Sequence, residues 1–148
     1  MSFVPERAVR THSFTLDRPI AQAFVLFTPE GERAWAEGWN PTYMHPRDGR
    51  TEAGMVFTTG HGGESTIWLM TRHDVAAGIV EYVRTTPGNR TGTVLVQCAS
   101  LGPTTTRVTV IYSLTALSEA GNQALRELDP ASYRDYIDSW KTDIEKAS

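Results

Sequence analysis

The sequence predicts an α+β fold in which a curved antiparallel sheet wraps around a long C-terminal helix. Three observations indicate this class. An amphipathic segment of helical length closes the chain, a series of strand-like segments joined by short turns precedes it, and two short helices follow the first strand. A sheet with one apolar face needs a cover, and the last helix is the only predicted element large enough to provide it.

The C-terminal helix is expected over residues 129–148. Asp129 can accept hydrogen bonds from the first free amides, and Pro130 suits the first helical position. The large side chains that follow recur at steps of three and four residues and therefore share one face. They are Tyr133, Tyr136, Ile137, Trp140 and Ile144.

Strand-like segments fill the middle of the chain. They are expected at residues 9–16, 55–59, 65–73, 79–86, 91–100 and 107–117, and a bridging helix is expected at 118–128. The short turns between consecutive strands predict an antiparallel meander. The last strand alternates most clearly, with Val108, Val110, Tyr112 and Leu114 on one face.

The N-terminal part is expected to form a loose arm at residues 1–9, a first strand and two short helices. The helices start near Pro19 and Pro29, and Glu32 is well placed to form a capping box with Thr28. Residues 39–51 are expected to form a loop that carries large side chains, among them Trp39, which usually fold back over an apolar surface.

The length, composition and charge of the chain limit the classes of protein to which it can belong. The chain has 148 residues and is expected to form one domain over 1–148, with 40% hydrophobic residues and a net charge of -3. The scattered basic residues argue against a nucleic-acid partner, and no apolar run is long enough to span a membrane. The single cysteine, Cys98, excludes a disulfide within one chain, so we expect a cytoplasmic protein.

No cofactor or metal is expected. The four histidines, His12, His45, His61 and His73, are isolated from one another, and no metal-ligand spacing occurs. The glycines after His61 indicate a flexible turn, because no helix follows that could hold a pyrophosphate.

The order of elements resembles the START/SRPBCC superfamily, which shares the helix-grip fold with the birch-pollen allergen. Residues 28–39, TPEGERAWAEGW, are similar to the short-helix region of small bacterial members, and residues 107–122 are similar to their last strand and its exit. The resemblance implies a cavity between sheet and helix. Members include ligand carriers, polyketide cyclases and dehydratases, lipid-transfer domains and activators of a chaperone ATPase. The superfamily has no universal catalytic motif, so the resemblance implies no catalytic residue.

Candidate ligand-binding residues follow from large or polar side chains expected near the cavity. They are Trp39, Trp68, Met70, Arg72, Tyr82, Arg84, Tyr112, Tyr136 and Trp140. If Trp68 and Met70 face inward, the period of two places Arg72 on the same side. An inward arginine could bind a carboxylate or stabilise an enolate, whereas an outward one would be solvated; parity alone does not decide between them.

Three functions fit these observations. The first is binding of a small hydrophobic or aromatic metabolite in the cavity. The second is an enzyme of the cyclase, dehydratase or hydrolase type, with Arg72, Arg84, Glu81, Tyr82 or Tyr112 as candidate groups. The third is a protein-interaction module with a filled core and an exposed apolar patch. A homodimer through an exposed edge strand is compatible with all three.

Overall fold

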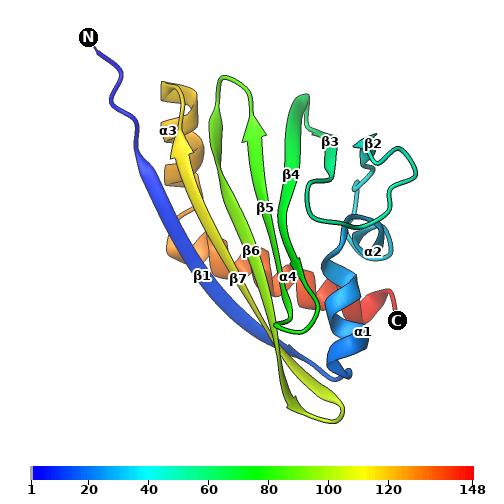
Figure 1. Cartoon of the computed structure of the whole chain (residues 1–148). Coiled ribbons are helices and arrows are strands. Elements are labelled where there is room, and N and C mark those ends of the chain that lie inside the picture. Colours follow the sequence, from blue (N-terminus) through cyan, green and yellow to red (C-terminus); the bar gives the residue numbers. More distant parts are fainter. Residues whose placement is uncertain (1) are drawn as a thin grey trace.

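The computed structural model describes residues 2–148 and contains one seven-stranded antiparallel sheet in the order β1-β7-β6-β5-β4-β3-β2. All neighbouring strands pair antiparallel, and the sheet curves around a long helix (Figure 1). The strands are β1 Arg7–Leu16, β2 Thr42–His45, β3 Val56–His61, β4 Glu64–Asp74, β5 Ile79–Thr86, β6 Arg90–Gly102 and β7 Thr105–Ala116. The predicted meander is therefore confirmed.

The helices gather on the concave side of the sheet. Figure 1 shows α4 crossing behind the strands, α3 near the upper ends of β1 and β7, and α1 and α2 beside the C-terminal end of α4. The helical segments are α1 Ile20–Phe24, the 3₁₀ turn η1 Val25–Phe27, α2 Pro29–Glu32, α3 Glu119–Glu127 and α4 Pro130–Lys146. The predicted fold class, with two short helices after the first strand and a long closing helix, is confirmed.

One face of α4 forms the centre of the core. Its four buried side chains are Tyr133, Ile137, Trp140 and Ile144. They meet the inward residues of the strands, such as Val108 and Val110, which are fully buried. The Tyr133 hydroxyl donates a hydrogen bond of 2.7 Å to the carbonyl of Val110, so the helix is also held by a polar contact. Asp129 caps this helix, as predicted, by accepting from the amide of Ser132 at 2.8 Å.

Three local expectations are wrong. The first strand starts at Arg7, and the residues before it are held by Asn122, which accepts from the Glu6 amide at 2.8 Å; the loose arm is therefore shorter than residues 1–9. The loop over 39–51 contains the short strand β2. Thr28 caps α2 through the Gly31 amide, but its own amide donates to the Val25 carbonyl, so Glu32 forms no capping box.

None of the helices in residues 2–148 combines the length and the apolar character needed to cross a bilayer.

We predict that Ile137→Ala lowers the free energy of unfolding by about 2–5 kcal/mol, because this side chain is fully buried between α4 and the sheet. Chemical denaturation followed by circular dichroism measures the change. Arg134→Ala, on the exposed side of the same helix, is the control and is expected to change stability by no more than about 0.5 kcal/mol. Equal effects of the two substitutions would contradict the packing described above.

Candidate functional site

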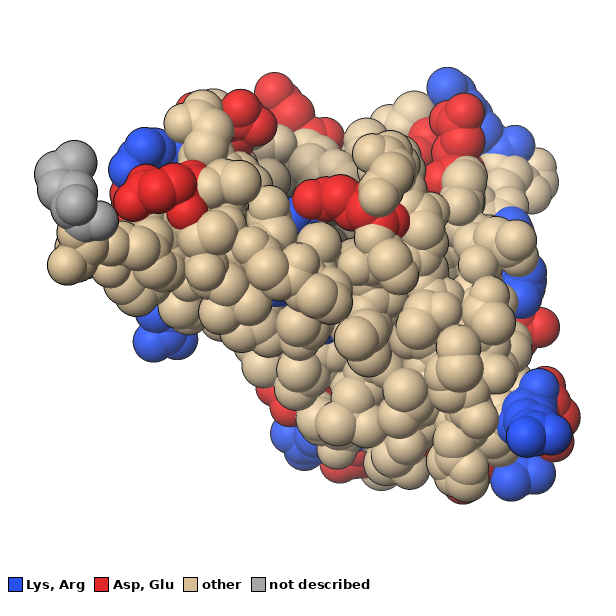
Figure 2. Space-filling model, turned by 90° about the horizontal axis from the view of Figure 1, so that it is seen from above, with Lys and Arg blue, Asp and Glu red and all other residues tan. Residues whose placement is uncertain are grey.

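A pocket of about 630 Å³ lies between α4 and the concave face of the sheet. Seen from above, the molecule is hollowed, and acidic side chains gather around the hollow (Figure 2). The walls come from α2, α3, α4 and strands β3 to β7. A pocket of this volume is in the range that holds small-molecule ligands in proteins.

The wall on the helical side is aromatic. Trp140 of α4 stacks on Phe27 with 6.3 Å between ring centroids and meets Trp35 at 5.5 Å. Tyr136, one turn earlier in α4, lies 5.8 Å from Trp140 and 6.3 Å from Tyr112 on β7. Trp35 is fixed because its indole N–H donates to the Leu26 carbonyl at 2.9 Å.

The opposite wall is a second aromatic group on β3 and β4. Trp68 stacks parallel to Phe57 at 5.8 Å, and Trp39 packs edge-on against Trp68 at 5.6 Å. The indole N–H groups of Trp39 and Trp68 donate to the Pro29 carbonyl and to the Thr59 hydroxyl. The segment after α2 therefore folds back over the sheet, as expected for a loop that carries a tryptophan.

Arg84 brings a positive charge into the pocket from β5. Its guanidinium carbon lies 5.3 Å from the centroid of the Trp68 ring, and its Nη2 donates to the Thr86 hydroxyl at 3.2 Å. The Nε atom is buried without a hydrogen-bond partner in residues 2–148. Burial lowers the pKa of Arg84, although an arginine side chain stays protonated in proteins.

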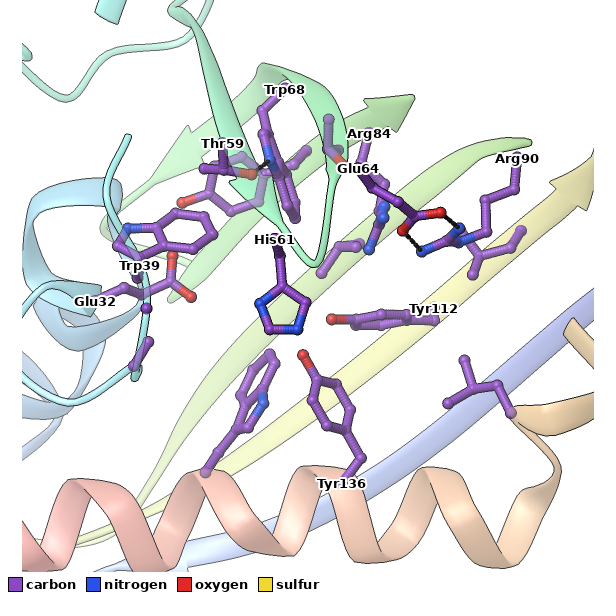
Figure 3. A pocket seen from close by; sticks show the side chains of 18 of the residues that line it. Glu32, Trp39, Thr59, His61, Glu64, Trp68, Arg84, Arg90, Tyr112 and Tyr136 are labelled. Atoms are coloured by element: carbon purple, nitrogen blue, oxygen red, sulfur yellow. Dashed lines mark hydrogen bonds and ion pairs between the residues drawn. The ribbon is translucent and has the colours of Figure 1, made fainter. Parts of the chain in front are cut away.

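Glu32 brings a carboxyl group into the pocket from the end of α2. Figure 3 shows the carboxyl group beside Trp39 and directed toward the interior. Burial alone raises the pKa of Glu32 well above its ordinary value, because removal of water disfavours the charged form. A carboxyl group in this state is able to hold a proton at a pH where exposed carboxyl groups have lost theirs.

The three tyrosines of the pocket differ in their hydrogen bonds. The Tyr82 hydroxyl donates to the Phe27 carbonyl at 2.7 Å and so acts as a brace between β5 and η1. Tyr112 and Tyr136 instead direct their hydroxyl groups into the cavity (Figure 3). Burial first, and then the neighbouring Tyr136, raise the pKa of Tyr112. The Tyr112 hydroxyl group is therefore a neutral donor within reach of a bound molecule, and the Tyr136 hydroxyl group lies beside the same space.

The mouth of the pocket lies at the β3–β4 hairpin. Gly62 and Gly63 have positive φ angles of 57° and 84° and form the tight turn that the glycine pair predicts. His61, at the end of β3, projects over the opening (Figure 3). Glu64 and Arg90 form an ion pair of 3.4 Å across the rim.

The structure brings seven of the nine candidate ligand-binding residues to this pocket. They are Trp39, Trp68, Tyr82, Arg84, Tyr112, Tyr136 and Trp140. Met70 is fully buried and does not line the pocket. Whether any of them binds a ligand stays a prediction.

Arg72 does not share the inward face, so the period-two expectation is wrong at this position. The register shifts between Met70 and Arg72, and Arg72 pairs with Glu81 on the outer face. There it is exposed and forms an ion pair with Asp74 at 3.2 Å. A bulge of this kind absorbs one residue and reverses the alternation beyond it. The Glu81 carboxylate likewise accepts from Thr71 outside the pocket.

The sequence reasoning missed several residues of the pocket. Glu32 was assigned to a helix cap, His61 to a turn, and Trp35 received no role. Alternation in the last strand and helical spacing at the C-terminus did carry a signal for Tyr112 and Tyr136.

Metal-ligand clusters and the single cysteine are two further possible features of the site. Within residues 2–148, no three histidine, cysteine or carboxylate side chains come together as metal ligands. Burial raises the pKa of the Cys98 thiol to about 12, which makes a nucleophilic thiolate unfavourable at neutral pH.

Comparison with known proteins gives a fold and no close relative. No protein-family profile and no characterised protein matches the sequence. Norcoclaurine synthase from Thalictrum flavum, in complex with dopamine and hydroxybenzaldehyde, superimposes with a TM-score of 0.68 at 8% identity, over 97% of this chain and 90% of that one. The chain has the helix-grip fold.

Two uncharacterised bacterial proteins have the same architecture. One from Rhizobium leguminosarum has a TM-score of 0.68 at 15% identity, over 97% of both chains. One from Helicobacter pylori has a TM-score of 0.64 at 10% identity, over 91% of this chain and 86% of that one. At these identities the likeness establishes the fold alone.

We predict that Glu32→Gln stabilises the protein increasingly as the pH rises above the ordinary pKa of a glutamate side chain. The unfolded chain ionises Glu32 at its ordinary pKa, whereas the folded chain retains the proton to a higher pH. Rising pH therefore favours the unfolded state between these two values, and the glutamine variant is free of this loss. Urea denaturation at several pH values measures the difference; Glu145→Gln, exposed on α4, controls for net charge. A constant difference across the pH range would show that Glu32 is not desolvated.

Proposed function

We propose that this protein is a member of the START/SRPBCC superfamily that binds a small hydrophobic or aromatic metabolite in the pocket between the sheet and α4. The observation that carries the proposal is the pair of aromatic walls around a volume of about 630 Å³. One wall centres on Trp140 and the other on Trp68. Flat apolar molecules gain both area burial and favourable ring contacts between such walls.

The walls are held in place before any ligand arrives. Trp35, Trp39 and Trp68 each donate an indole N–H to a protein oxygen at 2.8–2.9 Å. The Tyr82 hydroxyl ties β5 to the 3₁₀ turn under the same pocket. Side chains that are already ordered lose little conformational entropy on binding, which favours affinity.

We predict that the purified protein retains an apolar metabolite after dialysis against a mixed metabolite extract, as detected by mass spectrometry. Val94→Phe, which points a larger ring into the pocket from β6, is expected to abolish retention. Leu95→Phe makes the same kind of change one residue along, on the outer face of β6, and is the matched control. Melting temperatures of both variants establish that they fold. Enrichment of no compound over a control protein, or equal retention by both variants, would contradict the proposal.

An enzyme of the dehydratase or cyclase type is the second candidate. It is favoured by the placement of Glu32, Arg84 and Tyr112 around one cavity (Figure 3). In a dehydration, a base removes the proton beside a carbonyl, and an acid protonates the hydroxyl group, which leaves as water. Glu32 would supply the second proton, Arg84 would hold the enolate oxygen, and His61 at the mouth would accept the first proton.

For this candidate we predict that a retained β-hydroxy carbonyl compound loses one water molecule in the presence of the protein. Glu32→Gln is expected to slow this conversion about 100-fold or more, which is the scale of a general acid. Glu145→Gln is expected to leave the rate within about twofold, because Glu145 is exposed on the far part of α4. If the protein retains such a compound without converting it, ligand binding would stand as the function and this reaction would be excluded.

The interaction-module hypothesis requires a filled core, which the pocket of about 630 Å³ does not provide. We also propose a cytoplasmic location, supported by the single, buried and free Cys98. A homodimer remains a prediction; β1 and β2 are the edge strands that could pair with a second copy.

A further inference from the structure

We infer that the pocket selects ligands with a carboxylate group, which Arg84 binds through its guanidinium group while the apolar part lies between the aromatic walls. This inference rests on the proposed binding function and adds the chemical class of the ligand. Within residues 2–148, the Arg84 Nε is the one buried side-chain nitrogen or oxygen atom without a hydrogen-bond partner. Buried polar groups are nearly always paired, so an unpaired one at a cavity wall indicates a missing partner.

Arg84 also has no counter-ion among the described residues. The other arginine of the pocket, Arg90, is engaged by Glu64 at 3.4 Å and by the Asn89 side chain at 2.7 Å. None of the ion pairs in residues 2–148 includes Arg84. A buried charge without a partner is costly, and a ligand anion would remove that cost.

The guanidinium group is held at the wall of the pocket. The Trp68 ring covers one face of the group at 5.3 Å, and Thr86 accepts from Nη2. The Thr86 hydroxyl is itself bonded to Thr66 at 2.8 Å, which fixes its position. Figure 3 shows the nitrogen atoms of Arg84 directed toward the space enclosed by Tyr112 and Tyr136.

A carboxylate fits this arrangement better than other acceptors. Its two coplanar oxygen atoms match two parallel N–H groups of a guanidinium, whereas an amide or a ketone offers one oxygen. The hydroxyl groups of Tyr112 and Tyr136 lie on the same side of the cavity and can donate hydrogen bonds to further oxygen lone pairs. The apolar part of the ligand then has the space beside Trp35 and Trp140.

The acidic rim does not oppose this assignment. Glu37 and Glu127 are exposed, so water and salt weaken their repulsion of a ligand anion. This screening is nearly complete for exposed charges that are more than about 10 Å apart. Glu64 is neutralised by its ion pair with Arg90. Inside the pocket, the attraction of Arg84 acts through a medium with less water and is screened less.

The test uses matched pairs of probes that differ only in charge. Benzoate, 2-naphthoate and 9-anthroate are titrated into the 148-residue protein by calorimetry, each alongside its primary amide. The amide has nearly the same shape and keeps one carbonyl oxygen, so the pair isolates the contribution of the anion. We expect at least one carboxylate to bind about tenfold or more tightly than its amide, as for a charge-assisted hydrogen-bonded pair.

Three variants assign this preference to Arg84. Arg84→Met is expected to remove the preference while changing the affinity for the amide less than about threefold, because an apolar stem is kept in place of the charged group. Arg84→Lys is expected to retain part of the preference, since it keeps the charge and loses the planar fork. Arg72→Met removes the same charge from the outer face of β4 and is expected to bind as the wild type does. Circular dichroism of each variant establishes folding. If Arg84→Met does not fold, the reduced carboxylate preference expected of Arg84→Lys tests the role of Arg84 instead.

The outcomes separate this inference from the proposed function. Equal binding of carboxylates and amides would overturn the role of Arg84 and leave an aromatic pocket. If both Arg84→Met and Arg84→Lys keep the full preference for carboxylates, the anion binds elsewhere. That result would also overturn the role of Arg84. Failure of all six probes to bind would count against the pocket itself as an aromatic site.

Discussion

The contact between α4 and the concave face of the sheet is the interaction on which both the fold and the pocket depend. Tyr133, Ile137, Trp140 and Ile144 anchor the helix, and their burial supplies the apolar contact that an open sheet lacks. One helix does not cover the whole of a strongly curved sheet. In Figure 1 the strands β4 to β6 extend above α4, and the pocket occupies the space that this difference leaves.

The polar groups of the interior fall into two sets. Trp35, Trp39 and Tyr82 use their N–H or O–H groups to bind the backbone around α2 and η1, and so maintain the shape of the cavity. Arg84 and Glu32 are different, because burial disfavours the ionised form of each side chain and both line the cavity. Polar groups that the fold does not use are the ones available to a ligand or a reaction.

The architecture could be predicted from the sequence because its signals are local. The spacing in α4, the cap at Asp129 and the alternation in β7 each determine an element without reference to the rest of the chain. The site was harder to predict from the sequence, because it depends on how distant parts of the chain are arranged. A single bulge after Met70 turned Arg72 outward, and alternation alone gives no sign of such a bulge. Glu32 was missed because the same residue type at that spacing also fits a helix cap.

A crystal structure of the protein with its retained metabolite tests whether the space beside α4 receives a ligand. We expect a molecule enclosed between Trp140 and Trp68, with the helix-grip fold unchanged around it. A molecule found instead in the second pocket, beside α1 and lined by Phe24 and His73, would contradict ligand binding at this site. So would side chains closed over the position of the pocket.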